Sequence, residues 1–298
     1  MKEIRVNNLK KEEKIIYIIK DRFPNLSSST LYKALRNKDI KVNEKRINNP
    51  EYLVKSNDLI QIYINDSLLF GLPKEVNIQY EDDNILVAYK PQGILSNNED
   101  NEQTEPTFED FVKSVKGNNL KICHRLDRNT SGLIIFSKNN TSYSNLLEAF
   151  KEGYITKEYI AYVSGTSFDK TTYHYENYIL KDNKLGISRI YNKNLPNSQK
   201  IVTDIFVEKV YKQKDYSILR VIIHTGKTHQ IRALLSSISH PIIGDPKYGK
   251  NEINKKFKKY KQLLYAVKYS FKFPENSKLH YLNNISINLD TNIYTHKL

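Results

Sequence analysis

The segment from His124 to Gly132 places a histidine, two arginines and an aspartate before a Thr-Ser-Gly turn, and an apolar run from Leu133 to Phe136 follows. A short apolar run bounded by a turn is typical of a buried strand, so this segment fixes a junction between a loop and a strand. Charged side chains crowded before one turn are rarely selected for packing alone. They predict a cleft in which Asp127 acts as a nucleophile or general base. The structural alternative is that Asp127 caps the turn and the arginines are surface charges.

Composition limits the class of partner. The chain has 298 residues, enough for one large domain or for two unequal ones. Its 47 Lys and Arg exceed its 33 Asp and Glu, which gives a net charge of +14. Such a charge attracts polyanions and speeds their encounter, so nucleic acid is the first partner to consider. A biased composition, rich in Lys, Asn, Ile and Tyr, is the alternative explanation of the excess.

The cysteine count and the hydropathy of the chain exclude several classes of protein. Cys123 is the one cysteine, so neither an intrachain disulfide nor a cysteine-based zinc site can form. No stretch reaches the ~20 apolar residues of a membrane span, and Met1 to Glu13 lacks the apolar core of a signal peptide. His229 and His240 lack the spacing of a metal site with a third ligand nearby. We therefore expect a soluble, cytoplasmic, monomeric protein that needs no metal.

The apolar pattern predicts a small module at residues 1–65, a linker at 66–75 and a larger domain at 76–298. In the module, isoleucines at helical spacing predict a first helix, and Ser27 to Thr30 can cap a second one. Alternating apolar and polar residues near Ile40 and Ile60 then predict strands. The linker contains glycine and proline and shows no periodicity.

The larger domain shows several long strand patterns and few helices between them. Thr141 and Thr228 are each placed to cap a helix with an apolar stripe, and residues 97–107 form an acidic, polar stretch that we expect to be mobile. The strand patterns occur at Ile85–Tyr89, Tyr159–Val163, Ile201–Val207 and Ile218–Ile223. This order predicts an α+β fold with a mixed, mainly antiparallel central sheet and flanking helices around a cleft.

Four separated segments resemble, in the same order, the motifs of the RluA-type pseudouridine synthases. The segment around Asp127 is similar to the catalytic motif of that family, in which the aspartate after His-Arg-Leu is essential. The other three are Lys90-Pro91-x-Gly93, Lys157 to Gly165, and Thr225 to Arg232 with its continuation through His240 to Gly249. The resemblance implies the pseudouridine synthase fold and isomerisation of uridine to pseudouridine in RNA without an external cofactor.

The resemblance also implies roles for single residues. Asp127 would be the catalytic residue, as nucleophile on the sugar or base or as a base for an eliminated sugar. Tyr159 would line the base pocket and handle a proton, and Arg232 would pair with Asp127; we expect Arg232 to project beside the core. Arg125 would fill the place that the flipped uridine leaves. The remaining residues expected to bind substrate are His124, Thr130, Lys157, Lys227 and His229.

The choice of RNA rests on the first module and on charge. Residues 1–65 resemble a small RNA-binding module that is shared with a small-subunit ribosomal protein. This fusion favours large-subunit ribosomal RNA as the substrate, and transfer RNA is the alternative within the family. A non-catalytic RNA-binding assembly factor and a glycosidase are alternatives from other classes. The basic segment from Lys247 to Lys261, which carries seven lysines and one glutamate, and the basic turn at 36–46 are expected to contact phosphates.

Overall fold

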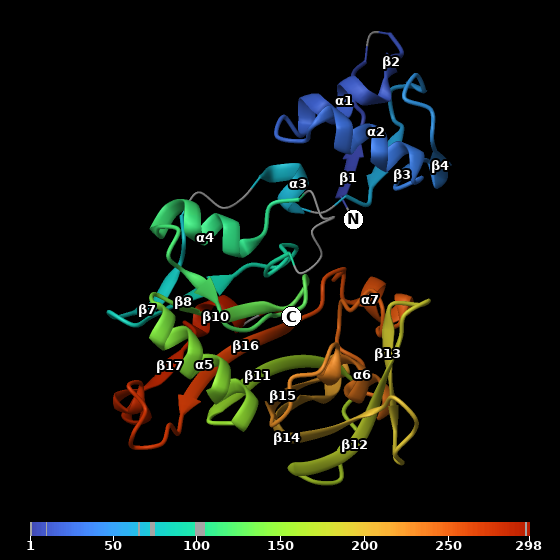
Figure 1. The fold of residues 1–298 in the computed structure, drawn as a ribbon. Helices are drawn as coiled ribbons and strands as arrows, with labels where there is room; N and C mark the ends of the chain where they lie inside the picture. Colours follow the sequence, from blue (N-terminus) through green and yellow to red (C-terminus); the bar gives the residue numbers. More distant parts are fainter. Residues whose placement is uncertain (1, 10, 65, 72–74, 99–104, 296) are drawn as a thin grey trace. The chain divides into compact units, whose positions relative to one another are not determined.

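The computed structural model describes the chain with the exception of residues 1, 10, 65, 72–74, 99–104 and 296 (Figure 1). Its described residues form two compact units, one from residues 1–74 with 100–106 and the other from 75–99 with 107–298. Within the described ranges no helix is both long enough and apolar enough to cross a bilayer.

The first unit packs two helices against small antiparallel sheets. Ser27 accepts a hydrogen bond from the N–H of Thr30 and so caps α2, as its sequence predicts. The core is made of branched apolar side chains from both helices and from the strands, Ile15, Ile19, Leu31, Leu35, Ile40 and Ile60 among them. The elements are β1 (Lys2–Arg5), β2 (Glu13–Lys14), α1 (Ile15–Arg22), α2 (Ser28–Arg36), β3 (Ile40–Val42), β4 (Lys45–Ile47), β5 (Leu53–Val54), β6 (Leu59–Ile62) and α3 (Asp66–Phe70). The first sheet has the order β1-β6-β3-β4, and β2 pairs with β5.

The second unit is built on one large sheet. Its described strands follow the order β13-β12-β14-β15-β11-β16-β10-β8-β7, with β17 paired to β16 and β9 to β10. Every pairing is antiparallel except that of β10 with β16, so the sheet is mixed as predicted. The strands are β7 (Ile78–Glu81), β8 (Ile85–Lys90), β9 (Lys121–Ile122), β10 (Ser131–Ser137), β11 (Ile155–Ser164), β12 (Thr172–Asp182), β13 (Ile187–Tyr191), β14 (Gln199–Tyr211), β15 (Tyr216–Ile223), β16 (Leu264–Phe271) and β17 (Ser286–Asn288).

Helices cover the sheet at both ends. In Figure 1, α5 runs beside β10 and β11, whereas α6 lies against the β13 end of the sheet. The helices are α4 (Phe108–Lys116), α5 (Asn140–Glu152), α6 (Gln230–Ser237), α7 (Asn251–Lys256) and α8 (Thr291–Tyr294), with short 3₁₀ turns η1 (Lys212–Lys214) and η2 (His280–Asn284). The segment that carries Asp127 lies in the loop between β9 and β10, and β10 lies between β16 and β8 in the sheet.

Gly132 allows β10 and β16 to approach each other closely. Its φ is +128°, and a Cβ built there would lie 2.3 Å from the carbonyl oxygen of Ala266. A side chain is therefore excluded both by backbone conformation and by the neighbouring strand. The glycine of the Thr-Ser-Gly turn thus brings the start of β10, just after Asp127, against the centre of the sheet.

Some local predictions differ from the structure. Helix α5 is capped by Asn139 and not by Thr141, because the Asn139 side chain accepts from the N–H of Ser142 at 2.8 Å. The expected linker contains the short helix α3, while its residues 72–74 lie outside the described residues. The expected mobile stretch, 97–107, falls largely on residues 99–104, which also lie outside them.

Candidate active site

Backbone hydrogen bonds fix the loop that carries Asp127. Ser96 Oγ donates to the carbonyl of Leu126 at 2.8 Å and accepts from the Leu126 N–H at 3.0 Å. On the other side of Asp127, the N–H of Thr130 donates to the Asp127 carbonyl at 3.0 Å and closes a turn. Because its backbone is held on both sides, the carboxylate is presented from a preorganised loop.

Lys90 supports the same loop from the interior. Its side chain is fully buried, and its ammonium donates to the carbonyls of Pro91, Ile94 and Arg128 at 3.1, 2.9 and 3.1 Å. Burial lowers the pKa of Lys90 to about 7, and the nearby charge of Asp127 opposes that shift. Three acceptors match the three N–H bonds of a charged lysine, so Lys90 ties the end of β8 to the loop that carries Asp127.

A buried arginine connects Asp127 to a second carboxylate. Arg232 on α6 donates through Nη1 to Oδ2 of Asp127 at 2.8 Å. Its Nε and Nη2 donate to the two oxygens of Asp245 at 2.7 and 3.0 Å, a bidentate contact. Burial disfavours the charged guanidinium, but the two carboxylates outweigh this and raise the pKa of Arg232. Arg232 is only 4% exposed, so the expectation that it projects beside the core is wrong: its charge is compensated inside the fold.

Exposure increases along this chain of charges toward Asp127. The side chains of Asp245, Arg232 and Asp127 are 0%, 5% and 25% exposed. Arg232 holds Oδ2 of Asp127, and within the described part of the chain no hydrogen bond reaches Oδ1. The geometry therefore leaves one oxygen of an oriented carboxylate open to a ligand.

His229 also lies near Oδ2 of Asp127. Its Nε2 lies 3.9 Å from Oδ2 of Asp127, and burial lowers its pKa, so the imidazole is neutral at neutral pH. His229, with φ of +61°, occupies the N-cap position of α6, and its side chain makes no capping bond. The prediction that Thr228 caps this helix is therefore wrong; instead Gln230 Oε1 accepts from the N–H of Lys227 at 3.1 Å.

Tyr159 lies in the sheet close to Asp127. It sits on β11 opposite Val221 of β15 and Ala266 of β16, and it is 7% exposed. Burial, and then the negative charge of Asp127, raise the pKa of Tyr159. The phenol is therefore protonated at neutral pH and can donate a proton or hydrogen bond, but it is not a base in the resting protein.

His124 has a structural place. Its Nε2 accepts from the N–H of Ile135 at 3.0 Å, and its ring contacts Phe150 and Tyr269 with centroids 4.7 and 5.3 Å apart. Burial, and then the charge of Lys157, lower the pKa of His124 to about 3. Because Nε2 already accepts a hydrogen bond from Ile135, we do not expect this nitrogen to contact the substrate.

Replacing His124 with glutamine should make the free energy of unfolding fall less steeply as the pH is lowered below neutral. The folded state keeps this ring neutral, while the unfolded state takes up a proton near pH 6.5, so acidification from there toward pH 3 favours unfolding by up to about 1.4 kcal/mol per pH unit. Glutamine can still accept from Ile135 but does not titrate. Urea unfolding at several pH values measures the slope. The control is His174→Gln, because a hydrogen bond to Asp204 raises the pKa of His174 and its contribution has the opposite sign. An unchanged slope for His124→Gln would contradict the assignment.

Four other residues are expected to bind substrate, and the structure gives them different surroundings. Thr130 is buried and its Oγ1 accepts from Gln262 at 2.6 Å, so it supports the turn from inside. Lys157 is half-buried, with its ammonium 5.7 Å from the centre of the Phe150 ring, and burial lowers its pKa. Arg125 is exposed, and Lys227 is half-buried. Of these four residues, Arg125, Lys157 and Lys227 stay candidates for RNA contact.

Sequence reasoning gave no role to Ser96, Asp245, Tyr248 or Ser188, although Asp245 and Tyr248 lie in a segment that resembles the family. Asp245 is enclosed by its turn, since its Oδ1 also accepts from the N–H groups of Lys247 and Tyr248 at 2.8 and 3.0 Å. Arg232 was a partial signal: a guanidinium next to the apolar stripe of a helix needs a nearby anion if it is buried, but the sequence does not say which one.

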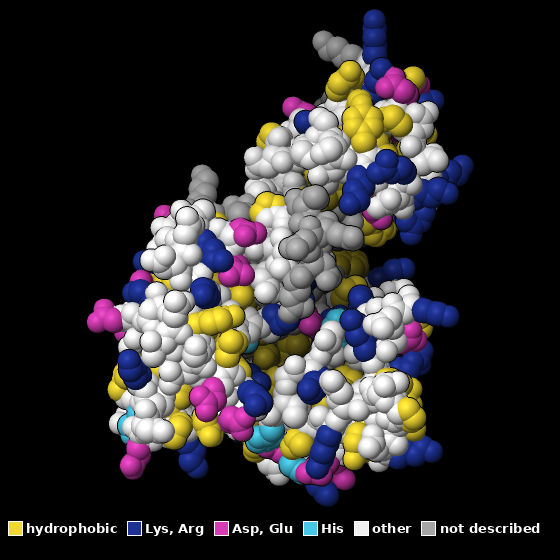
Figure 2. Space-filling model, in the orientation of Figure 1, with side chains coloured by type: hydrophobic (Ala, Val, Ile, Leu, Met, Phe, Trp, Pro, Cys, Tyr) yellow, Lys and Arg dark blue, Asp and Glu magenta, His cyan; other side chains and the backbone are white. Residues whose placement is uncertain are grey.

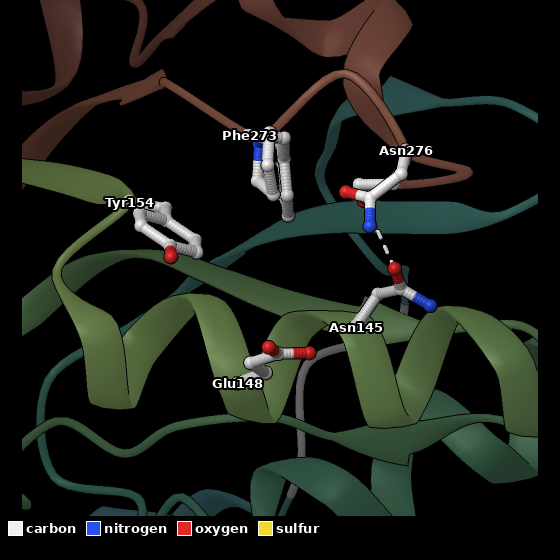
Figure 3. A pocket seen from close by; sticks show the side chains of 7 residues that line it. Asn145, Glu148, Tyr154, Phe273 and Asn276 are labelled. Atoms are coloured by element: carbon white, nitrogen blue, oxygen red, sulfur yellow. Dashed lines mark hydrogen bonds between the residues drawn. The ribbon is translucent and has the colours of Figure 1, made fainter.

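A separate cavity of about 110 Å³ lies between α5 and the chain after β16. Asn145 and Glu148 of α5 face Phe273 across it (Figure 3). Ser277 Oγ donates to Asn145 Oδ1 at 2.9 Å. None of the candidate residues lines this cavity, so we assign it no part in the site.

The fold is similar to that of a solved human protein. The human RNA pseudouridylate synthase domain containing 1 superposes with a TM-score of 0.59 at 21% identity, over 73% of this chain and 84% of that one. The model of the RNA pseudouridylate synthase family matches residues 84–237, just over half of the chain, which includes Asp127 and Arg232. The chain belongs to this family, as its motifs indicate, and is an RNA pseudouridine synthase, an isomerase.

Relatives match the chain over nearly its whole length. An uncharacterized RNA pseudouridine synthase of Mycoplasma capricolum is 30% identical over 95% of this chain and 96% of its own length. The ribosomal large subunit pseudouridine synthase C of Buchnera aphidicola is 31% identical over 94% and 92%. The similarity therefore includes the first unit as well as the unit that carries the site.

Proposed function

We propose that this enzyme isomerises specific uridines of large-subunit ribosomal RNA and that Asp127 is its catalytic residue. The observation that supports the role of Asp127 is its geometry: Arg232 holds Oδ2, and Oδ1 is open at the exposed end of the network. The support for the substrate is the name of relatives that cover most of the chain, the large-subunit synthases C and D of Buchnera aphidicola.

Charge supports RNA binding by both units. The segment Lys247–Lys261, which contains α7, carries a net charge of +6, and Figure 2 shows lysine and arginine side chains over α7 and β13. In the first unit, the turn at 36–46 carries Arg36, Lys38, Lys41, Lys45 and Arg46. Such groups contact phosphates without reading sequence, so they hold the RNA while the site selects a uridine.

The reaction replaces the N1–C1′ bond of uridine by a C5–C1′ bond, and the proton leaves C5 while N1 gains one. The uridine is flipped from folded RNA into the site, and Arg125 enters the vacated place in the stack. The Asp127 carboxylate attacks the sugar or base, or removes a proton from the sugar as the base departs. Arg232 orients this carboxylate through its hydrogen bond to Oδ2, and the protonated Tyr159 lines the base pocket.

The test is a map of pseudouridine in total RNA from cells with and without the gene, complemented by the wild type or by Asp127→Asn. We expect one or a few positions of large-subunit ribosomal RNA to lose the modification, and only the wild type to restore it. Loss at transfer RNA positions would overturn the proposed substrate and keep the enzyme class. Restoration by Asp127→Asn would overturn the catalytic role of Asp127.

A further inference from the structure

Tyr248 and His229 form a hydrogen-bonded pair behind the catalytic carboxylate. Oη of Tyr248 lies 2.9 Å from Nδ1 of His229, and the two rings meet edge to face with centroids 5.4 Å apart. The backbone N–H of Ser188, on β13, donates to the same Oη at 2.5 Å. The hydroxyl accepts from Ser188 and keeps its single proton, which it can donate to Nδ1 of His229.

A Tyr248 hydroxyl that donates to Nδ1 selects one tautomer of His229. A neutral imidazole carries its proton on one nitrogen, and the hydrogen bond made by the other nitrogen decides which. With Nδ1 accepting from Tyr248, the proton resides on Nε2, the nitrogen 3.9 Å from Oδ2 of Asp127. His229 therefore presents an N–H group to the carboxylate oxygen that Arg232 also holds.

The backbone before His229 is held by the same strand. His229 has a left-handed φ of +61°, a backbone conformation that is strained for a residue with a side chain. Ser188 is 3% exposed, and its Oγ donates to the carbonyl of Thr228 at 2.9 Å. One buried residue of β13 thus fixes both the Tyr248 hydroxyl and the peptide that leads into His229.

We propose that Tyr248 is a positioning residue, supported by Ser188, that holds His229 as a neutral hydrogen-bond donor to Asp127. The inference rests on the proposed catalytic role of Asp127. Hydrogen bonds of catalytic groups are often long in the unliganded protein and tighten when substrate binds, so the 3.9 Å gap suits a contact that closes on the substrate complex. Because Nδ1 is engaged and Nε2 is protonated, His229 has no free lone pair and is not the base of the reaction.

The first test reads the tautomer directly and needs no RNA. Nitrogen-15 NMR of protein labelled at histidine distinguishes protonated from unprotonated ring nitrogens, and the His229 signals are those missing from His229→Gln among the 7 histidines. We expect the proton on Nε2 in the wild type and its partial transfer to Nδ1 in Tyr248→Phe. Phenylalanine keeps the ring that lies 5.1 Å from Cζ of Arg232 and removes only the hydroxyl. A proton on Nδ1 in the wild type would overturn the proposal.

The second test asks whether Tyr248 acts through His229. We expect Tyr248→Phe to lower turnover of RNA roughly 10-fold, and to add nothing in a His229→Gln background, because both variants break the same contact. If Tyr248→Phe lowers turnover by the same factor in the His229→Gln background, Tyr248 has a merely structural role and does not act through His229. Tyr281→Phe is the control, since it loses a hydroxyl bond of 2.7 Å to Asp82, which is not part of the site, and should keep full activity. If the tautomer result holds but Asp127→Asn stays active, the proposed role of Asp127 fails and the hydrogen-bond assignment stands.

Discussion

Replacing Asp127 with asparagine should reduce turnover by about 10⁴-fold or more and leave RNA affinity unchanged or slightly higher. Asparagine has the same shape and can still accept from Nη1 of Arg232, but its amide is neither a nucleophile nor a base. Affinity is retained because phosphate contacts supply most of it, and loss of one negative charge favours a polyanion.

Two measurements on one RNA separate these effects. Release of tritium from RNA labelled at C5 of uridine reports turnover, since that hydrogen leaves the base when the new bond forms. A binding titration at fixed salt gives the affinity. The control is Asp83→Asn, which removes the same charge from an exposed turn between β7 and β8 and should change neither quantity. Loss of both turnover and binding in Asp127→Asn would indicate a structural residue.

The elements of the second unit could be predicted where periodicity is strong. The apolar run after Gly132 is the buried strand β10, and the patterns near Tyr159, Ile201 and Ile218 lie in β11, β14 and β15. These strands are read from local alternation and composition. Their order in the sheet is not local, since β11 lies between β15 and β16, which follow it in the chain by more than 50 residues.

The sequence singled out Asp127 and Arg232 as residues of the candidate site, but it did not indicate most of the contacts that hold them. Asp127 and Arg232 are separated by 105 positions, and the family resemblance alone suggested that they meet. Nothing local indicates that Arg232 is shared with Asp245 or that His124 accepts from Ile135. Such contacts depend on which face of an element a distant strand covers, and a sequence motif fixes the residue type without fixing the direction of its side chain.

The predicted capping residues of α5 and α6 are wrong for a related reason. Asn139 and Thr141 are both capping residues, and the choice between them depends on where the chain leaves β10. At α6 the chain enters through the left-handed His229, a conformation that no propensity favours. Ser188 Oγ donates to the carbonyl of Thr228, and Tyr248 is hydrogen-bonded to the His229 ring, so these contacts hold the irregular start of the helix in place.

Replacing Arg232 with methionine should lower the free energy of unfolding by about 3–5 kcal/mol and abolish turnover. Methionine fills much of the volume but leaves Asp245, which is 0% exposed, as an unpaired buried charge. The control, Arg220→Met, should cost less than about 1 kcal/mol, because the pairs that Arg220 makes with Glu208 and Glu158 are partly solvated.

A second substitution should separate stability from catalysis at this pair. In Arg232→Met with Asp245→Asn, the buried charge is gone, and the asparagine oxygen can still accept from the N–H groups of Lys247 and Tyr248. We expect urea unfolding followed by circular dichroism to recover most of the lost stability, while tritium release stays at the level of the single variant. Asp127 then lacks the hydrogen bond from Arg232 that orients it, so a folded protein without turnover is the expected result. Recovery of turnover together with stability would mean that Arg232 serves the fold alone.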